Sequence, residues 1–416
     1  MFRDGRFCYR IGAIAVDDNT VYLGFQGPKS TIAAFKQEDM SFIGIYNSMC
    51  GSPYCMIVMR EEKKLACSTT AGYIYVWDTS DDTLNRLRRI TIDPLTINGF
   101  VHRDTRVTCV FEVASEALED CIQIDHIPNS PIIVALSSKG DITFFDITNE
   151  AKGASFCPLE HGIRAECLKI DPQLSVFRES NGHWMAIGCS KGIIVLLFVE
   201  LQMLDEYRSA KSDESIGPSK IYTMTHKTGD RANINSVEFR FKSANSNNVT
   251  LLAGCSDGVV RCVVFKQVED SLKVHKAASY MHCRSTKSGS VLRIVSYRSP
   301  EGSPYMISLC KMQMPFELYN VPDGECRGMI QESANICSEL IMQKLLHDQS
   351  DQHTVLAHMR ECVTDVKVSM DHSCIIFTTF NNIYILRRYA EENQWYKPSR
   401  VEWKTEDNLK RMAKVL

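Results

Sequence analysis

The fold of this chain is most constrained by residues 65–78, which read LACSTTAGYIYVWD. Two segments rich in apolar, β-branched and aromatic residues flank Ala71 and Gly72. Such segments favour strands, and Gly tolerates the positive φ that a tight hairpin turn needs. The stretch therefore predicts a β-hairpin that ends in Trp77 and Asp78.

Six other segments repeat this hairpin in weaker form. Their turns carry dipeptides such as Lys139-Gly140, Asp257-Gly258 and Asn381-Asn382, which suit tight turns. The segments are residues 21–35, 132–146, 184–199, 251–265, 305–321 and 373–389. Seven copies over 416 residues predict a repeat array rather than one ordinary compact domain.

Small residues recur shortly before the turns. Cys67-Ser68, Cys189-Ser190 and Cys255-Ser256 fall at the same place in three copies, and Ser137-Ser138 holds it in a fourth. We expect close packing there, because sheets that converge on an axis leave room only for small side chains. A metal cluster is the alternative, but none of the 17 cysteines forms a Cys-x-x-Cys pair, so no metal site is predicted.

The hairpins resemble those of the WD-repeat family of β-propellers. Trp77-Asp78 matches the family's Trp-Asp, Phe145-Asp146 ends another copy, and residues 234–239 look like the family's innermost strand. Glu160-His161-Gly162 and His358 stand where the family often has Gly-His. Most copies lack the Trp-Asp, so the chain resembles a divergent member.

The resemblance implies an all-β fold in which each blade has four antiparallel strands and ~40–45 residues. Seven copies then imply a seven-bladed β-propeller over residues 1–404, with short helical loop insertions. Residues 405–416 form a short tail with apolar residues at helical spacing. The ring is expected to close through residues 7–11, through residues 400–404, or through both.

Extra length lies at residues 79–106, 200–219 and 323–352, and we expect it between third and fourth strands. Residues 333–346 predict a helix that packs onto its own domain or, as the less favoured alternative, docks a partner. Residues 200–217 begin with an apolar helical face but end polar and charged, and a solvated linker is the favoured interpretation.

Bulk properties bound the environment of the protein. The N-terminal MFRDGRFCYR has no apolar run after its charges, which predicts no signal peptide and therefore reduced cysteines in the cytoplasm or nucleus. The longest apolar run, residues 193–199, is far short of the ~20 residues of a membrane helix, so no transmembrane segment is predicted. A net charge of −3 argues against a dedicated nucleic-acid protein.

We expect a non-catalytic scaffold or adaptor that binds other proteins within a larger complex. The chain contains no Gly-x-x-x-x-Gly-Lys-Ser/Thr, Gly-x-Ser-x-Gly or His-Glu-x-x-His motif, and no enzyme activity or cofactor is predicted. The WD-repeat resemblance implies that partners bind at the turns between second and third strands. On that basis the predicted contact residues are Lys29, Tyr73, Lys139, Lys191, Arg261 and Arg360.

The alternative function is binding of nucleic acid or phosphoinositide at a basic patch near the chain termini. Closing a ring brings the termini together, which would gather their positive charges for phosphate groups. Solvated strand-edge charge is the favoured interpretation, because few aromatic residues are interleaved for base stacking. The predicted patch consists of Arg3, Arg6, Arg387, Arg388, Arg400 and Lys404.

Overall fold

The computed structural model describes the chain in separate segments. These are residues 10–26, 30–38, 42–46, 49–80, 106–107, 111–114, 121–148, 155–209, 221–228, 232–240, 248–281, 290–298, 304–310, 317–320, 363–369, 374–379, 383–387 and 399–401. The chain divides into two compact units. The first unit is Met1–Glu119 with Thr364–Leu416, and the second is Asp120–Val363.

The first unit contains three sheets. They have the strand orders β1 (Arg10–Val16), β2 (Thr20–Gln26), β3 (Thr31–Lys36), β4 (Phe42–Tyr46), β8 (Arg106–Val107); β5 (Pro53–Met59), β6 (Lys64–Thr69), β7 (Tyr73–Asp78), β9 (Phe111–Ala114); and β26 (Val363–Val368), β27 (Cys374–Thr379), β28 (Ile383–Arg387), β29 (Ser399–Val401).

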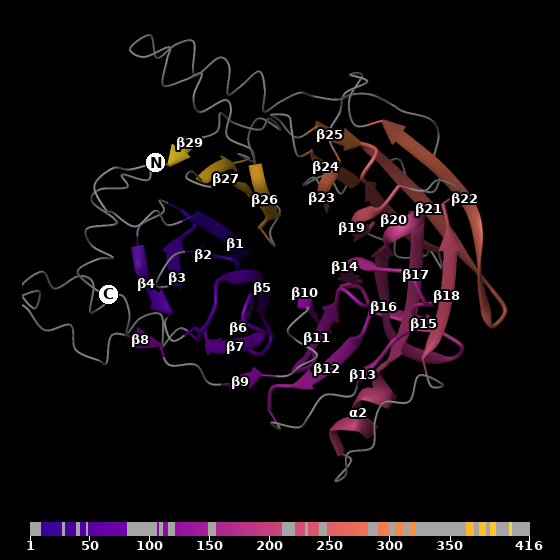
Figure 1. Cartoon of the computed structure of the whole chain (residues 1–416), viewed down its shortest axis with the longest axis horizontal. Helices are drawn as coiled ribbons and strands as arrows, with labels where there is room; N and C mark the ends of the chain where they lie inside the picture. The colour runs from indigo at the N-terminus through magenta and orange to yellow at the C-terminus, as the bar shows by residue number, and fades with distance from the viewer. Residues whose placement is uncertain are drawn as a thin grey trace, which may run out of the picture. The chain divides into compact units, whose positions relative to one another are not determined.

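The second unit contains four sheets, which follow one another in chain order (Figure 1). They have the strand orders β10 (Cys121–His126), β11 (Ile132–Ser137), β12 (Ile142–Asp146), β13 (Ser155–Phe156); β14 (Ala165–Ile170), β16 (Ser180–Cys189), β17 (Ile193–Glu200), β18 (Tyr222–Lys227), with β15 (Ser175–Phe177) beside β16; β19 (Ile234–Phe239), β20 (Asn248–Cys255), β21 (Val259–Val268), β22 (Ser271–Met281); and β23 (Val291–Arg298), β24 (Pro304–Cys310), β25 (Glu317–Asn320).

All seven predicted hairpins are confirmed. Each hairpin forms the second and third strands of one sheet; Leu65 lies opposite Trp77 in β6–β7, for example. The other pairs are β2–β3, β11–β12, β16–β17, β20–β21, β24–β25 and β27–β28. The predicted all-β class with repeated antiparallel sheets is therefore observed.

Three sheets differ from the predicted four antiparallel strands. β8 joins β4 as a parallel pair, with Arg106 opposite Ile45. β15 pairs with β16 and lengthens its sheet beyond β14. The β23–β25 sheet has three strands among the described residues.

One predicted insertion is ordered as a helix. α2 (Leu201–Ser209) follows β17 directly, and its Met203 and Leu204 are buried in the apolar core. Arg208 Nε donates to Asp146 Oδ2 at 3.2 Å, which ties the helix to the end of β12. The interpretation of this region as a solvated linker is therefore wrong for residues 201–209. The predicted helices at 333–346 and 405–416 lie outside the described residues.

The described residues at both chain ends belong to sheets of their own neighbours in sequence. Arg10 lies opposite Gln26 of β2, and Arg400 lies opposite Tyr384 of β28. Residues 7–9 and 402–404 of the two predicted closing segments lie outside the described residues.

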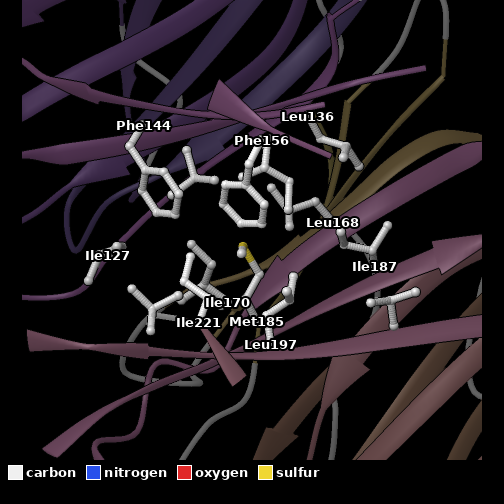
Figure 2. Close-up of a cluster of buried hydrophobic side chains, with 14 of the residues drawn as sticks. Ile127, Leu136, Phe144, Phe156, Leu168, Ile170, Met185, Ile187, Leu197 and Ile221 are labelled. Carbon is white, nitrogen blue, oxygen red and sulfur yellow. The ribbon is translucent and has the colours of Figure 1, made fainter. Parts of the chain in front are cut away.

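Middle strands of the second unit, such as β11 and β17, are buried on both faces, and this explains their uninterrupted apolar runs. Ile193 through Val199 of β17 are all buried. Figure 2 shows one side of this arrangement, where Met185 and Leu197 meet Phe144 and Phe156 of the preceding sheet. A second cluster covers the other face of the same sheet. Such double burial is unusual for antiparallel sheets, which commonly leave one face in water.

Glycines allow neighbouring sheets to approach closely. A Cβ atom added to Gly188 of β16 would lie 2.6 Å from Ile234 Cγ2 of the next sheet and 2.5 Å from Cys167 Sγ. Gly254 of β20 meets Val291 of the following sheet at 2.5 Å in the same way. The second strand of one sheet thus packs against the first strand of the next without room for a methyl group.

We predict that Gly188→Ala lowers the free energy of unfolding by about 1–3 kcal/mol, because overpacking a dense core forces backbone shifts. Urea unfolding followed by far-ultraviolet circular dichroism measures the change. Gly162→Asn is the matched control, since a Cβ added there would meet nothing within 4 Å and Asn tolerates the positive φ of 82°. Equal stability of the Gly188 variant and the wild type would contradict the close approach.

Candidate functional site

A β-bulge recurs at the same place in the first strand of six sheets. An extra residue there bends the strand and re-aims a side chain, which is common beside functional sites. The bulges lie between Ile11 and Ala13, Pro53 and Cys55, Cys121 and Gln123, Ala165 and Cys167, Ile234 and Ser236, and Val291 and Arg293.

The recurrent small residues of the second strands stand opposite these bulges. Ser137, Cys189 and Cys255 each pair with the residue that opens a bulge. Cys67 was predicted to be equivalent to Cys189 and Cys255. This prediction is wrong by two residues, because Thr69 holds the place opposite Pro53. The place is not restricted to small residues, because Phe25 holds it opposite Ile11 in the sheet of β1 and β2.

The hydroxyl residue after this position clamps the chain that enters the same sheet. Ser190 N–H donates to Arg164 O at 2.8 Å, and Arg164 N–H donates back to Ser190 Oγ at 3.0 Å. Ser256 and Asn233 form the same reciprocal pair at 2.8 and 2.9 Å. In the first unit, Thr70 and Ser52 repeat it.

Polar side chains of one first strand accept hydrogen bonds from backbone groups on the next first strand, at the edge that does not pair with its own second strand. Leu168 N–H of β14 donates to Gln123 Oε1 of β10 at 3.0 Å, and Ile170 N–H donates to Asp125 Oδ2 at 3.0 Å. An unpaired strand edge is a liability for aggregation, and these bonds satisfy it within the unit.

The next two first strands along the chain, β19 and β23, are linked in the same way. Ile294 N–H of β23 donates to Ser236 Oγ of β19 at 3.0 Å, and Asn235 Nδ2 donates to Val291 O at 3.0 Å. The first strands of the second unit are therefore linked in pairs by side-chain to backbone bonds.

These bonds position a continuous set of turns, which we call the rim of the second unit. The rim consists of residues 138–141, 157–164, 190–192 and 256–258. Ala165 N–H donates to Ser138 O at 3.2 Å, which joins the first two segments. The clamp between Arg164 and Ser190 joins the second and third, and Lys191 N–H donates to Asn233 Oδ1 at 3.3 Å.

A charged network lies on the rim side of the β14 bulge. Glu166 Oε1 accepts from Arg164 Nη2 at 2.7 Å and Nε at 3.1 Å, and from Asn233 Nδ2 at 3.4 Å. The Arg164 side chain is 64% exposed, whereas that of Glu166 is 19% exposed. This arrangement offers polar groups for recognition on a rigid base.

Two predicted contact residues, Lys139 and Lys191, lie exposed on the rim. Tyr73 begins β7 of the first unit and is partly buried, with its ring stacked on Tyr75. Lys29 and Arg360 lie outside the described residues.

Arg261 is a correction to the predicted surface contacts. Its side chain is only 6% exposed, and Nη2 and Nη1 donate to Asp257 Oδ2 and Oδ1 at 2.6 and 3.2 Å. The guanidinium is bound by a carboxylate four residues earlier in the turn. Its donors therefore serve the fold of the β20–β21 turn.

The predicted basic patch is not assembled by the described residues. Arg387 ends β28 and Arg400 lies in β29, and their side chains are outside the described part. Arg3, Arg6, Arg388 and Lys404 also lie outside it. The patch stays a prediction.

Buried thiols of the second strands and their neighbours are structural. Burial raises the pKa of Cys67 and of Cys167, and raises that of Cys189 to about 12. A thiol with a raised pKa is a poor nucleophile and metal ligand. Within the described segments, no group of three or more His, Cys, Asp or Glu residues is arranged to hold a metal ion.

Sequence reasoning missed Arg164, Glu166 and Asn233. The usable signal was positional, because Arg164 and Asn233 immediately precede Ala165 and Ile234, the first residues of two first strands. Bulges cannot be seen in a strand pattern, so the role of Glu166 had no signal in the sequence.

No helix among the described residues combines the length and apolar character that crossing a bilayer requires. In comparisons with protein-family profiles and with curated proteins, nothing matched the chain.

We predict an acid-dependent contribution of the Asp257–Arg261 pair. Partial burial raises the pKa of Asp257, but the hydrogen bonds and charge of Arg261 outweigh it and hold the pKa below 3.8. The stabilisation is therefore present above pH 3.8 and lost as the pH falls through the lower folded-state value. Asp257→Asn should be less stable than the wild type at pH 7, and this gap should shrink in acid.

Urea unfolding as a function of pH measures this gap. Asp270→Asn is the control, because Asp270 is an exposed turn residue. A gap that stays constant from neutral to strongly acidic pH would show that the ion pair does not carry the effect.

Proposed function

We propose that the chain forms one seven-bladed β-propeller and acts as a non-catalytic scaffold for partner proteins. Seven sheets, each with the recurrent hairpin at its second and third strands, support the number of blades. The bulge and the reciprocal hydrogen bonds recur from sheet to sheet, which supports a common ancestry of the sheets. The resemblance of Trp77-Asp78 and its surroundings to WD repeats supports the same fold.

The rim is the observation that carries the proposed binding function. Its turns are fixed by backbone bonds to neighbouring strands, while Lys139, His161 and Lys191 are exposed. Rigid, exposed polar groups lose little entropy when a partner binds. A scaffold needs this kind of surface more than it needs a cavity.

The proposal includes the way the ring is held. β1 and β29 each pair within their own sheet, so the first and last sheets meet by side-chain packing. Cys374 and Ile376 of β27 lie in one apolar cluster with Ile11, Ile14 and Val21. Packing of this kind would close the ring without exchange of a terminal strand.

We predict that electron microscopy of the purified chain shows a disc with a central opening and seven radial divisions. Double burial of the sheets and the repeated first-strand bonds favour a ring. Two separate lobes, or an open arc, in most class averages would contradict the propeller. Addition of an N-terminal fusion protein should leave the disc intact, since no terminal strand exchange is required.

We predict that the tagged chain recovers specific partner proteins from the cytoplasm or nucleus in near-stoichiometric amounts. His161→Trp, which places a large side chain on the rim, should reduce recovery roughly tenfold, because central contacts dominate binding energy. Quantitative mass spectrometry of affinity-purified complexes measures recovery.

The matched control is Asn181→Trp, an exposed position near the start of β16 and therefore at the other end of the strand. Recovery of the protein alone under gentle conditions would remove the scaffold proposal. Equal losses with both variants would show that the rim is not the binding surface.

A further inference from the structure

A short turn of the second unit joins two neighbouring sheets at the end of their strands away from the rim. Among the described residues β15 pairs only with β16, and Arg178 and Glu179 form the turn between them. Arg178 Nε donates at 2.9 Å to Asp270 O, which lies in the turn between β21 and β22. The rim turns lie at the opposite ends of β16 and β21. The contact therefore joins these sheets at the end that the rim turns do not hold.

The Arg178 side chain also lies over two aromatic rings. Its Cζ atom is 4.7 Å from the centroid of the Tyr222 ring and 5.3 Å from that of the Phe177 ring. Tyr222 begins β18, and its hydroxyl accepts a hydrogen bond from Leu272 N–H of β22 at 3.0 Å. A guanidinium group is attracted to the face of an aromatic ring. Together with the bond to Asp270, these contacts form what we call the Arg178 clasp.

The turn that carries the clasp is strained. Arg178 has a φ of 51° and Glu179 has a φ of 65°, and residues other than Gly, Asn and Asp seldom adopt such values. Glu269, which precedes Asp270 in the facing turn, has a φ of 53°. A strained backbone persists where the surrounding contacts hold it. The clasp supplies such contacts, so its loss should allow the turn to relax.

Few contacts attach β15 to the rest of its sheet. The strand has three residues, of which Ser175 and Phe177 are buried, whereas Val176 is 65% exposed. Leu174, which precedes the strand, is 55% exposed. Elements that bury little apolar surface open locally at a low free energy. Residues 174–179 are therefore the part of this sheet that can separate while β16 and β17 stay paired.

The clasp covers a buried aromatic cluster. Phe177 packs edge to face against Trp184 and Phe198, with ring centroids 5.0 and 5.3 Å apart. The three side chains are 1%, 2% and 1% exposed, respectively. Phe177 is the residue next to Arg178, so it leaves the cluster if the turn withdraws. Trp184 of β16 and Phe198 of β17 would then be uncovered.

We propose that the Arg178 clasp is a releasable contact, and that residues 174–179 open as a unit and uncover the aromatic cluster while the rim stays closed. The other end of the same two sheets is held by the close approach of Gly188 to Ile234, in which β15 takes no part. This opening is a conformational device separate from the proposed scaffold function, and it requires no partner.

Hydrogen exchange of the full-length chain, measured by mass spectrometry on its peptides, tests the opening. In Arg178→Gln, exchange of the protected amides in residues 174–183 and 268–275 should rise about tenfold, because a hydrogen bond from a charged group and the ring contacts are lost. Gln tolerates positive φ no better than Arg, so the strain of the turn is retained. Exchange in residues 187–195, beside the rim, should stay unchanged.

Two further variants separate the clasp from the strain. Tyr222→Phe keeps the ring under Arg178 but removes the acceptor of Leu272 N–H, so exchange in residues 268–275 should rise. Glu179→Asn keeps the clasp and places a residue that tolerates positive φ in the turn, so exchange in residues 174–183 should slow.

Lys63→Gln is the matched control. Lys63 is an exposed cation with a φ of 50°, and its bonds to Arg60 and Thr79 run through its backbone. Its replacement should change exchange in none of these segments.

A rise confined to residues 174–183 and 268–275 in Arg178→Gln, together with slower exchange in Glu179→Asn, supports the proposal. Unchanged exchange in both Arg178→Gln and Tyr222→Phe would overturn it, because the clasp would then hold nothing closed. An equal rise in residues 187–195 would also overturn it, since the two sheets would then open along their whole length.

Discussion

Burial of both faces of middle strands such as β17 is the constraint on which the rest of this structure depends. A strand such as β17 has no face left for water, so its residues are apolar throughout and its neighbours must approach closely. That approach leaves no room for a methyl group at Gly188 and Gly254. Because the interior is densely packed, the positions of the strands also fix the positions of the turns that connect them.

The first strands solve a second problem that this packing creates. Among the residues that the structure describes, each has one edge without a strand partner in its sheet, and an exposed row of backbone groups invites aggregation. Gln123 and Asp125 bind two of these groups on β14, and Ser236 binds one on β23. Satisfying the edges from neighbouring sheets also fixes how consecutive sheets are spaced.

The rim combines these two effects into a surface. Bulges turn the first strands where the clamps of Ser190 and Ser256 hold the incoming chain. The exposed side chains of the rim therefore belong to turns whose backbone is held by hydrogen bonds to neighbouring segments. Arg164 and Arg261 each bind a carboxylate nearby in the sequence, but the Arg164 side chain is 64% exposed whereas that of Arg261 is 6% exposed.

The sequence by itself determined the class of fold and its repeats. Strand-forming runs separated by tight-turn residues specify hairpins locally, and Gly72, Gly140 and Gly258 mark three of the seven turns with a positive φ. Lys139 and Lys191 could be named as exposed for the same reason, since a residue in a turn between two strands faces solvent.

Only the tertiary structure decided what those residues contact. Arg261 was predicted as a contact together with Lys191, yet it lies in β21, its side chain is 6% exposed, and Asp257 of the preceding turn binds it. The bulge at Glu166, the true equivalence of Thr69 and the packing of α2 depend on register between strands and on neighbouring sheets. These relations involve residues far apart in the chain, and no local pattern encodes which of them meet.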